Sequence, residues 1–152
     1  MEIRELRSGD ARSLSRLIAD VQDELPEAMT FGVLPPEQIG ETVKWKLDAV
    51  GRGAMADLVA VDGGAVVADC EILCEGREGT VGIIIEKRRR GRGIGGRLLE
   101  RCIARSRELG VRTVRARIME SNVRAISFFA RADFEKQAGA PGGVVLMSRA
   151  LL

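Results

Sequence analysis

Two kinds of hydrophobic pattern divide the chain into helices and strands. Apolar residues recur with helical spacing in four segments, which follow capping or turn residues at 8–10, 35–37, 91–96 and 121–122. Alternating or β-branched runs predict seven strands, over residues 1–6, 55–61, 65–73, 80–86, 111–119, 134–137 and 144–151. The order βααβββαβαββ predicts an α/β (α+β) fold, in which one domain over residues 1–152 has a mixed, mostly antiparallel sheet flanked by helices.

The three strands in the middle of the chain are expected to form an antiparallel meander. Asp62-Gly63-Gly64 separates the first two and is typical of a tight hairpin. Residues 81–85 of the third strand are rich in branched side chains, which favours a central place in the sheet.

Composition and charge narrow the class of protein. The chain has 152 residues, of which 45% are hydrophobic, so it is long enough for one well-packed domain. Its 24 basic and 22 acidic residues exclude a histone-like chain, a disordered tail and a membrane span. The charges are uneven, because residues 1–76 carry 7 basic and 15 acidic groups and residues 77–152 carry 17 and 7. The second half is therefore expected to bind an anion.

Missing residue types exclude several kinds of active site. The chain has no histidine and no tyrosine, so Ser-His-Asp and Cys-His catalysis is excluded. Cys70, Cys74 and Cys102 are an odd number in a sequence without a secretory leader, which indicates a reducing cytoplasm. These cysteines lack a second CxxC pair, so we expect core packing and no metal.

The most informative segment is residues 83–99. A branched strand runs into a loop with four glycines in six residues, Gly91, Gly93, Gly95 and Gly96, and then into an amphipathic helix. Backbone N–H groups at such a helix N-terminus can converge on an anion, and glycine allows phosphate oxygens to approach. Six cations surround the loop, namely Lys87, Arg88, Arg89, Arg90, Arg92 and Arg97. The segment thus suits a pyrophosphate or a nucleotide phosphate.

Three other interpretations of this segment stay open. Residues 91–96 also fit GxGxxG, with Glu120 downstream, as in a dinucleotide-binding fold; the intervening basic residues and the preceding meander argue against it. The basic run at 87–92 resembles a nucleic-acid patch, but only 3% of residues are aromatic, so stacking platforms are missing. The third interpretation is an ordinary solvated loop.

Two motifs resemble those of the GNAT superfamily of N-acetyltransferases. Arg90-Gly91-Arg92-Gly93-Ile94-Gly95 resembles its acyl-CoA-binding motif. A second motif of the family is met by Asn122, Ala125, Phe129 and Phe134. The resemblance implies direct transfer of the acetyl group of acetyl-CoA, as cosubstrate, to a primary amine of a small molecule, an amino acid or a peptide. We expect no metal, no nucleic acid and no membrane as partners, and the resemblance is compatible with a homodimer.

The resemblance also assigns residues to the cosubstrate. The pantetheine is expected along the backbone of Ile83, Ile84 and Ile85, between two strands that splay apart. The pyrophosphate is expected at the glycine loop, on Arg90, Gly91, Arg92, Gly93, Ile94, Gly95 and Gly96. Asn122 and Phe129 would lie near the pantetheine and thiol end. Residues 25–36 would shape the acceptor site.

The catalytic acid and base do not follow the family pattern. Phe129 stands where many relatives have a tyrosine that protonates the leaving thiolate, and Arg117 stands where one branch has a glutamate. Either another acid and base serve, with a carboxylate to remove a proton from the amine, or catalysis rests on positioning and water alone. Strand alternation places Cys70, Ile72 and Cys74 on the core side and Glu71 on the other, which makes Glu71 our choice as general base. The other carboxylates considered are Asp69, Glu75, Glu86 and Glu120.

Two further expectations concern function and one concerns the fold. Because Phe129 and Arg117 stand at two catalytic positions of the family, a second hypothesis is that the protein is a non-catalytic acyl-CoA-binding or regulatory module. The acidic residues Asp20, Asp23, Glu24 and Glu27 near the acceptor loop favour a cationic acceptor. Asp133 replaces the glycine that usually ends the last helix in the family, and it is expected to adopt the left-handed conformation there.

Overall fold

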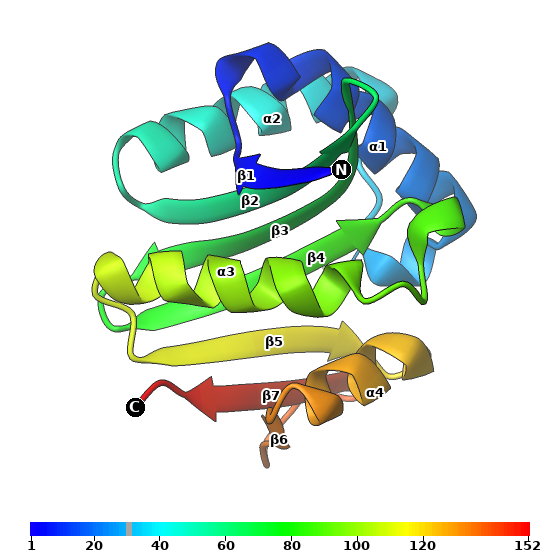
Figure 1. Cartoon of the computed structure of the whole chain (residues 1–152). Helices are drawn as coiled ribbons and strands as arrows, with labels where there is room; N and C mark the ends of the chain where they lie inside the picture. The colour runs from blue at the N-terminus through cyan, green and yellow to red at the C-terminus, as the bar shows by residue number, and fades with distance from the viewer. Residues whose placement is uncertain (30–31) are drawn as a thin grey trace.

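The computed structural model describes residues 1–29 and 32–152, and in them a seven-stranded sheet runs through the molecule (Figure 1). The strands are β1 (Glu2–Glu5), β2 (Met55–Asp62), β3 (Ala65–Glu75), β4 (Glu78–Ile85), β5 (Thr113–Met119), β6 (Glu135–Lys136) and β7 (Val144–Ala150). They lie in the order β1-β2-β3-β4-β5-β7-β6, and only β4 and β5 are parallel neighbours. The predicted mixed, mostly antiparallel sheet is confirmed.

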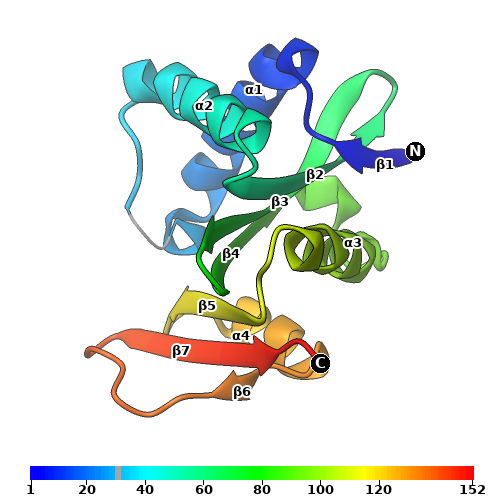
Figure 2. The same ribbon diagram turned by 90° about the vertical axis from the view of Figure 1, so that its left-hand side faces the viewer.

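Helices cover both faces of this sheet (Figure 2). Helices α1 (Ala11–Glu24) and α2 (Pro36–Gly51) pack on one face, and α3 (Ile94–Glu108) and α4 (Val123–Arg131) on the other. Three short 3-10 turns, η1 (Ser8–Asp10), η2 (Pro26–Ala28) and η3 (Lys87–Arg89), connect these elements. The element order is the one that the hydrophobic pattern predicts. Of the predicted loop 25–36, Thr30 and Phe31 lie outside the described residues.

Each layer of helices buries its own apolar cluster. On the α3 face, Leu98, Leu99 and Cys102 are fully buried against the sheet. On the α1 and α2 face, Leu14 and Val43 pack against Val59 of β2. The helical spacing of apolar residues thus determines which side of each helix faces the sheet.

The turn and cap residues predicted from the sequence lie at a turn and at a helix end in the structure. Gly63 and Gly64 connect β2 to β3 with φ values of 57° and 79°, the left-handed conformation of a two-residue hairpin turn. Asn122 is the N-cap of α4, and its side chain accepts a hydrogen bond from the backbone N–H of Ala125.

Asp133 adopts the left-handed conformation expected for it, with φ of 66°, just after α4. A side chain costs about 1 kcal/mol in this conformation relative to glycine, so Asp133→Gly is expected to stabilise the protein by about 0.5–1 kcal/mol. Urea denaturation measures the change. Asp133→Ala provides the comparison, because alanine tolerates the conformation less well than aspartate and should destabilise the protein. Equal stability of all three proteins would show that the backbone at this position carries no strain.

Strands β4 and β5 separate halfway along their length. Their pairing runs from Glu78 opposite Thr113 to Val81 opposite Ala116, and β4 then continues to Ile85 without pairing to β5. We call the last pair, Val81 and Ala116, the apex of the splay. Beyond the apex, the edge of β4 that faces β5 is open for another extended segment.

Candidate functional site

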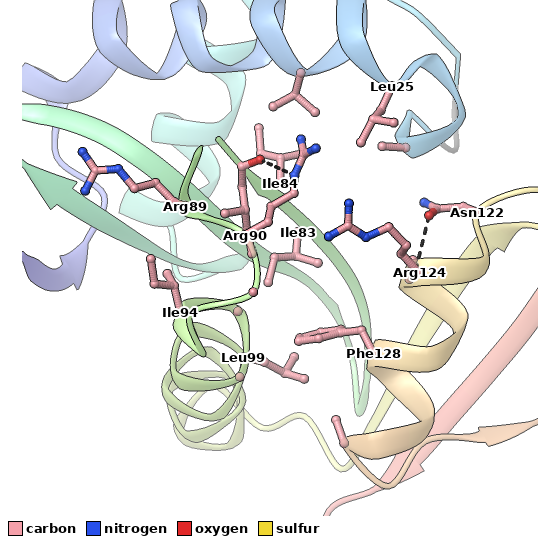
Figure 3. Close-up of a pocket in the computed structure, with 18 of the residues that line it drawn as sticks. Leu25, Ile83, Ile84, Arg89, Arg90, Ile94, Leu99, Asn122, Arg124 and Phe128 are labelled. Carbon is pink, nitrogen blue, oxygen red and sulfur yellow. Dashed lines mark hydrogen bonds between the residues drawn. The ribbon is translucent and has the colours of Figure 1, made fainter. Parts of the chain in front are cut away.

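A cavity of about 810 Å³ occupies the splay between β4 and β5. It reaches both faces of the sheet, since its walls include Val21 and Leu25 of the α1 side as well as Leu99 and Phe128 of the α3 and α4 side (Figure 3). Ile83, Ile84 and Ile85 of β4 line the cavity between these two sides. The cavity therefore passes through the sheet and has room for a ligand of cofactor size.

The glycine-rich loop forms one end of the cavity. Gly91 and Gly93 have φ values of 75° and 78°, and Gly93 is the N-cap of α3, so the free N–H groups of the first turn of the helix lie at the cavity wall. Gly95 serves close packing, because a Cβ there would lie 3.0 Å from the ring of Phe128 and 3.1 Å from Ile85. At Gly96 a Cβ would meet nothing within 4 Å. The loop therefore combines a backbone anion site with one glycine required for packing.

Arg90 connects the end of β4 to the end of α1. Its Nε donates to the carbonyl of Ile85 at 3.0 Å, and its two terminal nitrogens lie 2.6 and 2.7 Å from the carboxylate of Glu24. This bidentate hydrogen bond lowers the pKa of Glu24 below its ordinary value. Arg90 lines the cavity, but its guanidinium is engaged in this link. The exposed Arg124 and Arg131 of α4 are further cavity cations, which the sequence analysis missed.

The structure brings together ten of the twelve predicted cofactor-binding residues. Those that line the cavity are Ile83, Ile84, Ile85, Arg90, Gly91, Gly93, Ile94, Gly95, Gly96 and Asn122. The other two, Arg92 and Phe129, do not line it. Arg92 is exposed between the two glycines with positive φ.

A comparison with protein-family models matches residues 57–136 to the acetyltransferase (GNAT) domain. The chain belongs to the GNAT family. This assignment places the protein among the acyl-CoA-dependent acetyltransferases and confirms the resemblance seen in the two motifs. No curated protein sequence matches the chain significantly.

Solved structures support the GNAT fold over the whole chain. The GNAT domain of PAT from S. lividans is 24% identical, with a TM-score of 0.85 over 98% of this chain and 89% of that one. A ribosomal-protein-alanine N-acetyltransferase from Brucella melitensis is 22% identical, with a TM-score of 0.79 over 99% of this chain and 100% of that one. A phosphinothricin acetyltransferase from Sinorhizobium meliloti, solved with AcCoA, is 20% identical, with a TM-score of 0.80 over 99% of this chain and 88% of that one.

The aromatic side chain that lines this GNAT cavity is Phe128, whereas Phe129, which was expected at the cosubstrate, lies outside the lining. Phe129 is only 4% exposed, and its ring packs edge-on against Phe128 and Phe134 at centroid distances of 5.1 and 5.0 Å. Phe128 lines the cavity together with Ala125 and Ala132, which are three and four residues away on the same side of α4. Ala125, Phe128 and Ala132 form an apolar stripe along α4, and their spacing was the signal in the sequence for Phe128.

Glu71 lies outside the cavity lining, on the α2 face of the sheet and close to the apex. It is opposite Gly82 in the β3–β4 register, and a Cβ at Gly82 would lie 3.3 Å from its Oε1. Gly82 directly follows Val81, so the Glu71 carboxylate lies where β4 and β5 begin to part. Its side chain is 33% exposed.

Glu71 belongs to a group of four ionisable side chains, Lys46, Asp57, Asp69 and Glu71, which we call the ion cluster. The Nζ of Lys46 on α2 lies 2.5 Å from Oδ2 of Asp69, 3.2 Å from Oδ2 of Asp57 and 3.8 Å from Oε1 of Glu71. The side chains of Lys46, Asp57 and Asp69 are no more than 5% exposed. The sequence analysis placed Glu71 on this face and considered Asp69 among the other carboxylates, but it missed Lys46 and Asp57.

Burial and mutual interaction shift the pKa values in the ion cluster. Burial raises the pKa of Asp57 well above its ordinary value, and the carboxylate of Asp69 adds to the shift while Lys46 opposes it. Burial also raises the pKa of Glu71, again against the effect of Lys46. For Lys46, burial lowers the pKa, but Asp69, Glu71 and Asp57 together outweigh burial and raise the pKa well above its ordinary value.

The raised pKa of Asp57 predicts a pH dependence of stability. Between its ordinary value of 3.8 and its folded value, the folded state holds a proton that the unfolded state has lost. The free energy of unfolding should therefore fall as pH rises in this window, by up to about 1.4 kcal/mol per pH unit. Asp57→Asn removes the titrating group, so the variant should show a flatter pH profile in urea denaturation. Parallel profiles for the two proteins would contradict the shift.

Residues 1–29 and 32–152 contain neither a membrane-spanning helix nor a metal-binding cluster. None of the helices there has the length and apolar character that a membrane crossing requires. The same residues contain no group of three or more His, Cys, Asp or Glu side chains arranged to hold a metal ion.

Proposed function

We propose that the protein is an N-acetyltransferase that moves the acetyl group of acetyl-CoA to a primary amine of a small molecule, an amino acid or a peptide. The observation that carries the proposal is the cavity that passes through the sheet at the splay. A donor bound on the α3 and α4 side and an acceptor entering from the α1 side would meet there. Proximity of this kind lowers the entropic part of the barrier.

The residues at the cavity fit acetyl-CoA. The N–H groups at the start of α3 would bind the pyrophosphate, and the open edge of β4 at Ile83, Ile84 and Ile85 would bind the amide groups of the pantetheine. The bound cosubstrate supplies an activated thioester. The phosphinothricin acetyltransferase from Sinorhizobium meliloti, a protein of the same fold, was solved with AcCoA.

We infer that the general base is Glu71, whose carboxylate lies beside Gly82, where β4 and β5 begin to part. An alkyl amine has a pKa of about 10.4 and must lose a proton before it attacks the thioester. Glu71 lies near the apex, is partly exposed, and its raised pKa makes it a better proton acceptor at neutral pH. The chain contains no histidine or tyrosine for this task.

The charges near α1 give less support to a cationic acceptor than the sequence suggests. Glu24 is neutralised by Arg90, so it is not free to attract an amine. Of the four acidic residues near the acceptor loop, only Glu27 lines the cavity. We therefore propose a primary amine as the acceptor and do not require the acceptor to carry a further positive charge.

Calorimetric titration with acetyl-CoA tests the cosubstrate part of this proposal. Gly96→Asp is expected to weaken binding by about 1,000-fold, because a like charge about 4 Å from a phosphate costs about 4 kcal/mol at an effective dielectric constant of 20. The variant should fold well, since a Cβ at Gly96 has free space and an acidic residue suits the first turn of α3.

Gly40→Asp is the matched control. Gly40 is an exposed helical residue of α2, and a Cβ there also meets nothing within 4 Å, so this variant has the same change in charge away from the cavity. It should bind acetyl-CoA like the wild type. Equal binding by all three proteins would move the cosubstrate away from α3. Absence of binding by the folded wild type would overturn the proposed function.

Thiol release from acetyl-CoA with a panel of amines tests the catalytic part. We expect turnover with at least one class of primary amine. Tight binding of acetyl-CoA without turnover on the panel would favour the non-catalytic acyl-CoA-binding module.

A further inference from the structure

The charges of the ion cluster do not balance if every carboxyl group is ionised. Lys46 supplies one positive charge against Asp57, Asp69 and Glu71. Among the described residues, no donor meets the geometry of a hydrogen bond to either Oδ atom of Asp57 or to Oδ1 of Asp69; Nζ of Lys46 contacts Oδ2 of Asp57 at 3.2 Å without forming one. A proton on Asp57, donated to Asp69, satisfies one oxygen of each and leaves the buried part of the cluster neutral. The raised pKa of Asp57 agrees with this arrangement.

Such a cluster is a poor means of stabilising the fold. Burying charges costs several kcal/mol per ion, and apolar residues of similar size often serve stability as well or better. The same face of the sheet is apolar elsewhere, where Val59, Val66 and Ile84 pack against α1 and α2. Apolar side chains would therefore fit this layer, and the presence of charges instead points to a role beyond packing.

Glu71 is the member of the cluster that reaches the surface. The titratable groups that face it come from three elements: Asp57 lies opposite it on β2, Asp69 is on its own strand, and Lys46 is on α2. Its neighbour on β4 is Gly82, which has no side chain. The three buried side chains thus form the charged surroundings of the carboxylate at the apex.

We propose that Lys46, Asp57 and Asp69 are positioning residues that keep Glu71 ionised and basic enough to take the proton of the acceptor amine. This inference rests on the proposed function. Lys46, 3.8 Å away, favours the ionised form of Glu71. Asp69 lies closer to Lys46, at 2.5 Å, and limits how far Lys46 can weaken Glu71 as a base. The protonated Asp57 keeps this arrangement free of a further negative charge.

Acetyl transfer makes one carbon–nitrogen bond and breaks one carbon–sulfur bond. The amine nitrogen forms a bond to the thioester carbon, the carbon–sulfur bond breaks, and its electron pair leaves on the sulfur of CoA. Glu71 takes one proton of the ammonium group before the attack and forms an O–H bond. The second proton, which the nitrogen loses as the amide forms, passes through water to the sulfur of CoA. Glu71 then returns the proton to water, to which its partly exposed side chain has access.

The protonation state of Glu71 can be measured with and without its buried partners. Carbon NMR of the side-chain carboxyl groups follows the titration of Glu71 in the protein without ligand, and Glu71→Gln assigns the signal. In the double variant Asp57→Asn, Asp69→Asn, Lys46 faces Glu71 alone, so Glu71 should titrate at lower pH. Lys46→Gln should shift the titration to higher pH. Asp48→Asn removes an exposed carboxylate of α2 and should cause no shift.

The pH profile of kcat/KM gives a second readout. In the double variant the acidic limb should move to lower pH and the plateau should fall, because a more acidic carboxyl group is a weaker base. If Lys46→Gln does not fold, the double variant decides alone. Titration of Glu71 at the wild-type pH in the double variant would overturn the inference. If no amine is acetylated by the wild type, the proposed function fails, whereas the NMR titration still decides whether the buried residues control Glu71.

Discussion

Glu71→Gln is expected to lower kcat for amine acetylation by about 10²–10⁴-fold, the usual contribution of a general base. Glutamine has nearly the same shape as glutamate but accepts no proton at neutral pH. Binding of acetyl-CoA should be unchanged, because Glu71 lies outside the cavity lining. The defect should shrink as pH rises, since a growing fraction of the amine is then deprotonated in solution. Steady-state kinetics over a pH range and calorimetry measure the two quantities.

Glu41→Gln is the control for this loss of charge. Glu41 is an exposed residue of α2 whose side chain is 75% accessible, and its ion pair with Lys44 is long, at 3.4 Å. This variant should retain wild-type kinetics. A Glu71→Gln enzyme with full activity at neutral pH would show that another group, or water alone, removes the proton.

Lys46→Met is expected to destabilise the protein by about 3–5 kcal/mol at neutral pH. The substitution removes the cation and leaves the carboxylate of Asp69 buried without a counter-charge, which is the costly way to break a buried ion pair. The loss should be smaller at acidic pH, where protonation neutralises the carboxyl groups. Urea denaturation at several pH values measures both effects.

Lys44→Met is the matched comparison, because it makes the same substitution two residues away on the same helix. The Lys44 side chain is 75% exposed, so its removal should change the free energy of unfolding by less than about 0.5 kcal/mol. A similar, small effect of both substitutions would mean that the cluster carries little charge in the folded protein.

Local features of the sequence were sufficient to predict the elements. The spacing of apolar residues indicates helices and strands because it reflects which side of each element is buried, and the structure confirms their order. Turn and cap positions were equally predictable, since Gly63, Gly64 and Asn122 act through their own backbone or through the residues next to them.

Positions that depend on how elements pack were harder to predict. Trp45 and Lys46 are neighbours on α2, and hydrophobicity alone would bury the tryptophan; the structure leaves Trp45 49% exposed and buries Lys46. Lys46 follows Ile39 and Val43 by seven and three residues, so it lies on the side of α2 that faces the sheet. Its burial is tolerated only because β2 and β3 present carboxyl groups to it.

The sequence by itself determined the element order, the glycine loop at the start of α3 and the GNAT family, because these depend on residues close together along the chain. The tertiary structure decided that Phe128 and not Phe129 faces the cavity, that Arg90 joins α1 to β4, and that Lys46 meets Asp57, Asp69 and Glu71. These contacts join residues distant in sequence. They depend on the rotation of each helix against the sheet and on strand register, which the packing of the whole domain determines.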